Sequence, residues 1–120
     1  MKHKAAMQRY LDAVSAADLE AIYALFAPDA LVHSPTQGRP LTPQTFYPGL
    51  LARAKGTVFI AKSFFQAENP DRAAVLFDYR KPFTSGGMNV FDCVDIFDFD
   101  DAGKITEICI ILDTGKFSMS

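Results

Sequence analysis

The chain has 120 residues, of which 49% are hydrophobic and 22% charged, a composition typical of one globular domain, here expected over residues 1–120. Its net charge of −2 argues against nucleic-acid binding, because nucleic-acid-binding proteins usually carry a basic face. The apolar run over residues 108–112 is far shorter than the stretch that a membrane helix needs. The basic residues near the start of the sequence are not followed by the apolar core of a signal peptide. We therefore expect a cytoplasmic protein that does not contact membranes.

The N-terminal part of the chain predicts two helices and a strand. Apolar residues recur at spacings of three and four over residues 2–16, which predicts a helix with one apolar face. These residues are Met7, Tyr10, Leu11 and Val14. Asp18 is typical of an N-cap and begins a second short helix, which Pro28 is expected to end. A short strand over residues 30–34 follows.

A third helix is expected from Thr42, the predicted cap, to about Ala54, with a possible kink at Pro48. After Thr57 the apolar pattern changes to a period of two, typical of strands. Four strands separated by turn residues are expected, over residues 57–67, 73–82, 89–100 and 105–113. Helices that precede an antiparallel meander predict an α+β fold, with the helices packed on one face of a curved sheet.

The strand over residues 89–100 has two distinct faces, since successive side chains of a strand alternate in direction. One face is meant for burial and carries Phe91, Cys93, Asp95, Phe97 and Phe99. The opposite face, continued by Cys109 and Ile111 of the last strand, is too apolar to leave in water. A homodimer through this outer sheet face is therefore predicted.

Metal and cofactor chemistry find no support in the sequence. Cys93 and Cys109 each stand inside an apolar run and are expected to be reduced thiols. The two histidines have no spacing typical of metal ligands, so we expect no metal site and no cofactor.

Asp95 is the strongest polar candidate, because its neighbours on the predicted inner face are aromatic or apolar. A buried carboxyl group must be hydrogen-bonded, ion-paired or neutral. With a raised pKa it could donate a proton to a ligand oxygen, with Tyr10 as its partner. Alternatively, Asp95 belongs to a structural network with Tyr10 or Tyr47, and the sequence does not distinguish these two roles.

Two parts of the chain carry a resemblance to a known family. Residues 8–11, 17–20 and 24–30 resemble the opening of the SnoaL-like proteins, which belong to the nuclear-transport-factor-2-like superfamily together with ketosteroid isomerase. Residues 94–105 resemble the penultimate strand of that family, its Gly-Lys hairpin and the start of its final strand. The resemblance implies a conical α+β barrel with a deep apolar cavity, and dimerisation through the sheet.

Similarity to ketosteroid isomerase implies roles for individual residues. Tyr10 and Asp95 correspond to the tyrosine and the protonated aspartic acid that stabilise an oxyanion, and Phe46 and Tyr47 resemble a supporting aromatic pair in the third helix. Ser34 stands where the family has its proton-shuttling carboxylate, and a serine hydroxyl is not a base near neutrality. The residues expected to contact a ligand besides Tyr10 and Asp95 are Ser34, Tyr47, Phe77, Phe97 and Ile110.

Two functions remain open at this point. In the first, the protein is an isomerase-like or cyclase-like enzyme that polarises a carbonyl of a small apolar substrate through Tyr10 and Asp95. In the second, it is a non-catalytic ligand-binding or accessory protein that uses the same cavity. His33 could titrate near neutrality, but strand alternation points its side chain away from that of Ser34.

Overall fold

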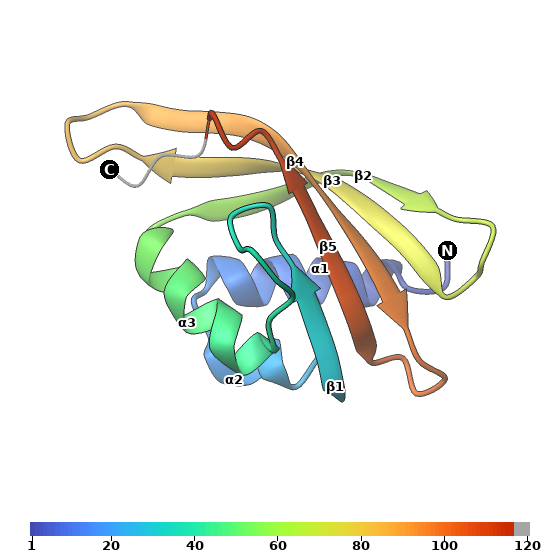
Figure 1. The fold of residues 1–120 in the computed structure, drawn as a ribbon. Coiled ribbons are helices and arrows are strands. Elements are labelled where there is room, and N and C mark those ends of the chain that lie inside the picture. The colour runs from blue at the N-terminus through green and yellow to red at the C-terminus, as the bar shows by residue number, and fades with distance from the viewer. Residues whose placement is uncertain (117–120) are drawn as a thin grey trace.

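The computed structural model describes residues 1–116, and the last four positions of the predicted domain, 117–120, lie outside the described residues. Three helices lie on one face of a five-stranded sheet (Figure 1). The helices are α1 (Lys4–Ser15), α2 (Leu19–Tyr23) and α3 (Pro43–Arg53). The strands are β1 (Phe26–His33), β2 (Val58–Gln66), β3 (Arg72–Pro82), β4 (Met88–Phe99) and β5 (Ile105–Leu112).

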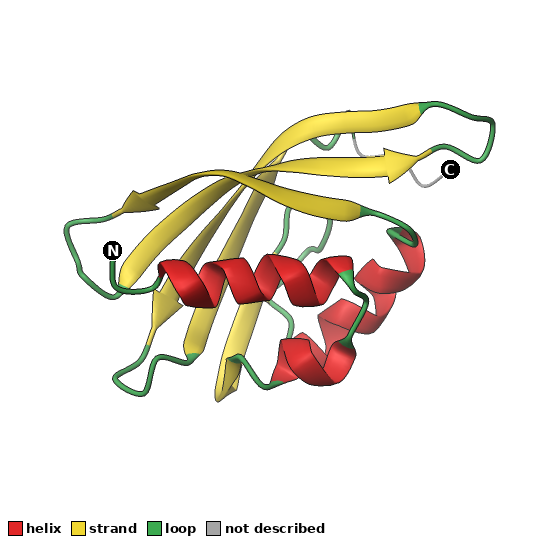
Figure 2. Cartoon of the chain, turned by 180° about the vertical axis from the view of Figure 1, so that it is seen from behind, coloured by secondary structure: helices red, strands yellow, loops and turns green. Residues whose placement is uncertain are grey.

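The sheet has the order β1-β5-β4-β3-β2, which contains the expected antiparallel meander of β2 to β5. The first strand adds to this meander by pairing in parallel with β5, where His33 lies opposite Cys109. Because β1 and β2 are both edge strands, the sheet stays open and does not close into a barrel. Figure 2 shows the twisted strands crossing above the layer of helices, which confirms the predicted α+β class.

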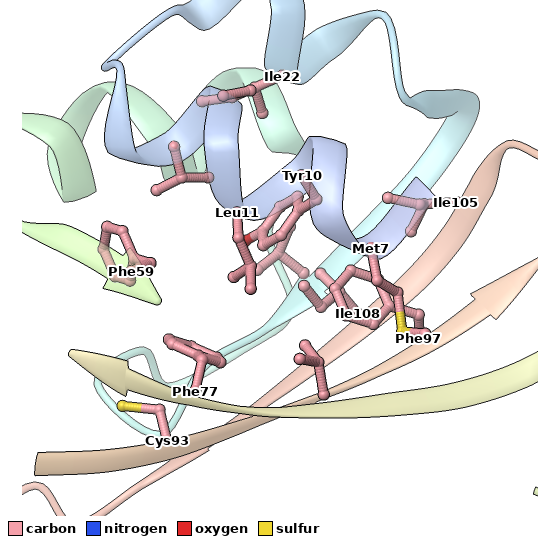
Figure 3. Packing of buried hydrophobic residues seen from close by; sticks show 14 of the residues in the cluster. Met7, Tyr10, Leu11, Ile22, Phe59, Phe77, Cys93, Phe97, Ile105 and Ile108 are labelled. Atoms are coloured by element: carbon pink, nitrogen blue, oxygen red, sulfur yellow. The ribbon is translucent and has the colours of Figure 1, made fainter. Parts of the chain in front are cut away.

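The first helix matches its prediction in position and in its apolar face. Met7, Tyr10, Leu11 and Val14 are each at most 4% exposed and point toward the sheet. In Figure 3 Tyr10 and Leu11 extend from the helix toward Phe77 on β3. This apolar stripe therefore forms the upper wall of the space between helix and sheet.

The second helix is shorter than predicted, and the first strand begins earlier. Asp18 caps the helix as expected, its carboxylate accepting from the backbone N–H of Ala21 at 3.1 Å. The helix nevertheless ends at Tyr23, and the carbonyl of Leu25 accepts a hydrogen bond from the backbone N–H of Ile105. Pairing with β5 thus continues the chain as a strand through Pro28. An edge strand tolerates a proline, because one of its sides has no neighbouring strand that would need the missing backbone N–H.

The third helix runs without interruption from Pro43 to Arg53. Thr42 caps it, its hydroxyl accepting from the backbone N–H of Thr45 at 3.3 Å, and proline stands at the first helical position as predicted. Pro48 lies inside this helix and does not divide it into two. The helix consequently presents one continuous face to the sheet.

The predicted alternation of β4 is confirmed by burial. Its inward side chains are at most 6% exposed, whereas Val90 on the outer face is 46% exposed. The inward side chains are Phe91, Cys93, Asp95, Phe97 and Phe99.

Within residues 1–116 no helix has the length and hydropathy that crossing a membrane would require.

Candidate ligand-binding site

An apolar pocket lies between the helices and the inner face of the sheet. Its polar lining residues are Tyr10, Ser34, Thr36, Arg53, Tyr79, Cys93 and Asp95. Its remaining walls are Leu11, Val14, Phe46, Leu50, Phe59, Phe77, Ile110 and Leu112. The space open to water-sized molecules is about 40 Å³, enough for a few waters, since one water needs at least about 10–15 Å³. A larger ligand must therefore displace lining side chains.

Asp95 lies on β4 between Ile110 of β5 and Val75 of β3, its register neighbours. It is 2% exposed, and its Oδ1 is buried without a hydrogen-bond partner among the described residues. Burial raises the pKa of this carboxyl to about 8, because the charged form loses its hydration. The side chain is therefore a neutral acid near neutrality, with a proton available for donation.

Tyr10 on α1 and Tyr47 on α3 form the polar pair next to this acid. Their hydroxyl oxygens are 2.6 Å apart, and either hydroxyl could be the donor. Burial raises the pKa of both phenols well above their usual value, and the negative charge of an ionised Asp95 would raise them further. Both phenols consequently keep their protons, and Tyr10 lines the same pocket as Asp95.

The structural network that the sequence left open is present only in part. Tyr10 and Tyr47 bond to one another, but Asp95 makes no hydrogen bond to either of them. The two groups that were expected to hold a ligand oxygen thus line one pocket while the acid remains unsatisfied.

Ser34 lines the pocket just after β1, at the position implied for a catalytic base. Its hydroxyl lies 2.9 Å from that of Thr36 and accepts from the backbone N–H of Thr36 at 3.3 Å. These contacts stabilise a turn and involve no titratable group. Asp95 is the only carboxyl among the described residues that line the pocket.

The other expected contact residues fall into two groups. Phe77 and Ile110 line the pocket, whereas Tyr47 and Phe97 are not part of its lining. The ring of Phe97 is fully buried and packs edge-on against Tyr10, with 5.2 Å between centroids. In the described conformation Tyr47 and Phe97 support Tyr10 and do not face the cavity, and their direct contact with a ligand stays a prediction.

Four polar lining residues were missed, namely Thr36, Arg53, Tyr79 and Cys93, and the pattern contained signals for Tyr79 and Arg53. Tyr79 follows Phe77 by two positions on β3, so the two share the inner face. Arg53 follows Phe46 and Leu50 at helical spacings of seven and three, and all three line the pocket.

The Nε2 of His33 lies instead 3.4 Å from a carboxylate oxygen of Glu107. No group of three or more His, Cys, Asp or Glu side chains within residues 1–116 could hold a metal ion.

Comparison with known proteins decides the family. A family model described as a SnoaL-like domain matches residues 7–108, which is most of the chain. The chain is a SnoaL-like domain. This SnoaL-like domain is 34% identical over 111 residues to the steroid Delta-isomerase of Nocardioides simplex, covering 88% of the chain and 85% of that protein.

Solved structures confirm the fold of the SnoaL-like domain. The putative polyketide cyclase IdmH from Streptomyces antibioticus aligns with a TM-score of 0.82 at 19% identity, over 98% of this chain and 96% of that one. RV0760c from Mycobacterium tuberculosis, solved with estradiol-17beta-hemisuccinate, aligns with a TM-score of 0.78 at 18% identity, over 95% of each chain. At such identities the structural likeness shows the fold alone.

Proposed function

We propose that this SnoaL-like domain binds a small apolar molecule through one electron-rich oxygen, which accepts hydrogen bonds from Tyr10 and Asp95. The observation that carries the proposal is the buried carboxyl of Asp95, whose Oδ1 has no partner among the described residues. A buried polar atom without a hydrogen-bond partner destabilises the folded chain by about 1–3 kcal/mol. A ligand oxygen that pairs with Asp95 would remove this destabilisation. A carbonyl oxygen suits the site because its two lone pairs can accept from both donors at once.

The walls around the two donors favour an apolar and preferably flat ligand. Phe46, Phe59 and Phe77 supply aromatic surface, and Leu50 and Leu112 are partly buried residues at which the pocket could widen. Estradiol hemisuccinate, bound by the structural relative RV0760c, is a ligand with such a body. The current space of about 40 Å³ means that entry of any such molecule requires these side chains to move.

Binding of 2-acetylnaphthalene, compared with 2-ethylnaphthalene, tests this proposal by calorimetry. The two molecules have similar apolar bodies, and only the ketone offers an acceptor oxygen. We expect the ketone to bind roughly 10-fold more tightly, the effect of two neutral hydrogen bonds. Tyr10→Phe and Asp95→Leu should each reduce this preference, and Tyr23→Phe, outside the pocket, should leave it unchanged.

The pH dependence of ketone binding supplies a second readout. The affinity should fall above pH 8, because ionised Asp95 can no longer donate to the carbonyl oxygen. Asp95→Asn retains an N–H donor without a titrating proton and should bind the ketone with a flat pH profile. Equal affinities for the two naphthalenes in the unsubstituted protein would contradict the proposal.

A second candidate function is isomerisation of an unsaturated ketone, favoured by the 34% identity to a steroid Delta-isomerase. That reaction requires a base that moves a proton next to the carbonyl, and the described lining contains no second carboxyl group. We therefore expect no turnover of a β,γ-unsaturated ketosteroid by the unsubstituted protein, followed as conjugated-enone absorbance.

Restoring a carboxylate at position 34 should change this outcome. Ser34→Asp is expected to give measurable proton transfer, at least 100-fold above the unsubstituted protein, since a positioned general base contributes roughly 10²–10⁴-fold. Thr36→Asp, two residues along the same loop, serves as the matched control. Turnover by the unsubstituted protein at the rate of Ser34→Asp would instead favour the isomerase.

We also propose that two copies of the chain associate through the outer face of the sheet. Leu76, Val94 and Ile111 lie opposite one another on three adjacent strands, and Ala74, Ile96 and Cys109 form a second such row. These six residues, named here the outer apolar patch, are half-buried or exposed in the single chain. A contiguous apolar patch of this kind is typical of a protein interface.

A further inference from the structure

The wall of the pocket contains a guanidinium group as well as the carboxyl of Asp95. Arg53 is half-buried in the last turn of α3 and lines the same apolar pocket as Tyr10 and Asp95. Its side chain has no ion-pair or hydrogen-bond partner among residues 1–116. A cation that faces an apolar cavity without a counter-charge gains from an anionic partner, because the low dielectric strengthens the attraction.

Sheet register places the backbone of Arg53 well away from that of Asp95. Asp95 lies opposite Val75, whereas Lys81, six residues later on the same strand, donates to the backbone oxygen of Arg53 at 3.0 Å. Six residues of extended strand span roughly 20 Å. In Figure 1 this end of α3 lies beneath the hairpin that joins β3 and β4.

Two further observations bear on the position of the guanidinium. A Cβ built on Gly49, one helical turn earlier, would lie 3.1 Å from Nη1 of Arg53, so the side chain folds back along the helix. Burial raises the pKa of Tyr79, and the positive charge of Arg53 opposes this shift. The charge of Arg53 therefore acts on the phenol of Tyr79, which is itself part of the pocket wall.

We infer that Arg53 forms an anion-binding subsite at the end of the pocket away from Asp95, so that the preferred ligand carries a carboxylate or similar anion in addition to the oxygen held by Tyr10 and Asp95. This inference rests on the proposed function and adds the ligand class to it. The ligand is then an elongated apolar acid, with a carbonyl or similar oxygen at one end and the anionic group at the other. A guanidinium suits the second role because its fork of donors matches a carboxylate.

Calorimetric binding of 6-acetyl-2-naphthoate and of its primary carboxamide tests the subsite. The two molecules have nearly the same size and the same ketone, and they differ at the far end, where an uncharged amide replaces the anionic carboxylate. We expect the carboxylate to bind roughly 10-fold more tightly, the gain typical of hydrogen bonds to a charged group. This preference should weaken with added salt, because screening reduces the attraction.

Substitutions then assign the preference to one residue. Arg53→Gln should abolish the preference for the carboxylate over the carboxamide, and Arg53→Lys should retain part of it. Arg80→Gln is the matched control, because Arg80 is exposed on the outer face of β3 and its loss changes the net charge equally.

Each possible result decides between the two proposals. Equal affinity for the two ligands, or a preference that persists in Arg53→Gln, would overturn the subsite and leave the proposed function intact. Failure of both ligands to bind would overturn the proposed function and the subsite together. If Arg53→Gln does not fold, the ligand pair on the unsubstituted protein and on Arg53→Lys still decides.

Discussion

Asp95 makes the stability of the folded chain depend on pH, because its carboxyl titrates differently in the two states. The folded chain holds its pKa at about 8, whereas an exposed aspartate titrates near pH 4. Between these values the unfolded chain has released the proton and the folded chain has kept it. The free energy of unfolding contributed by Asp95 is therefore highest below pH 4, declines as pH rises and levels off above pH 8.

Asp95→Asn should remove this decline. Relative to the unsubstituted protein, the free energy of unfolding of the variant should rise with pH between pH 4 and pH 8, by roughly 1 kcal/mol for each pH unit. Urea denaturation at several pH values measures the difference. Asp92→Asn is the control, because Asp92 lies on the outer face of the same strand, where Lys62 lowers its pKa. Parallel stability profiles for the unsubstituted protein and Asp95→Asn would contradict the assignment.

The sequence predicts the donor pair better than the rest of the site. Helical spacing identifies Tyr10 and strand alternation identifies Asp95, because both patterns report directly on which side of an element a residue lies. The contact between Tyr10 and Tyr47 and the missing partner of Asp95 depend on side-chain positions from three elements. Arg53 was missed because charged residues at helix ends are usually solvated, and only the three-dimensional arrangement of the helices and the sheet shows that it lines a pocket.

At the scale of elements, α3 carries much of the pocket wall. Phe46, Leu50 and Arg53 line the pocket from this helix, and Tyr47 bonds to Tyr10. Since the helix has only 11 residues and contains Pro48, its first turn depends on the cap at Thr42.

Thr42→Ala is expected to lower the free energy of unfolding by about 1 kcal/mol, because the backbone N–H of Thr45 loses its acceptor. Thr45→Ala is the matched control: it also removes the bond between the two hydroxyls but leaves the cap to the backbone intact. Urea denaturation should show a clear loss for Thr42→Ala and a change within about 0.5 kcal/mol for Thr45→Ala. Equal losses of unfolding free energy in the two variants would show that the cap at Thr42 does not stabilise the helix in this way.

Local patterns predicted every helix and the four-stranded meander, but not the exit from α2. There the helix gives way to β1 because Leu25 and Ile105 pair across 80 positions of sequence. The parallel pairing of β1 with β5 also depends on such distant contacts, which neither apolar period nor capping residues report. The elements formed by nearby residues are thus predictable, and the position at which a distant partner changes their boundary is not.

At the scale of the whole molecule, the outer apolar patch is the feature that a single chain leaves unexplained. The three helices cover only the inner face of the sheet (Figure 2). Ile111, in one of the two rows of the patch, is 48% exposed, and Val94 and Leu76 continue this row across β4 and β3. Pairing of two such faces would bury apolar surface that water now contacts, the main source of stability in homodimers.

Ile111→Lys should therefore convert a dimer into a monomer, because a like charge from each copy would meet inside the interface. Light scattering coupled to size exclusion should give twice the chain mass for the unsubstituted protein and a single chain mass for the variant. Val58→Lys is the matched control, since Val58 is 46% exposed on the edge strand β2, outside the outer apolar patch, and this variant should remain a dimer. A monomeric unsubstituted protein at micromolar concentration, or a dimer that survives Ile111→Lys, would show that copies of this chain do not associate through the outer apolar patch.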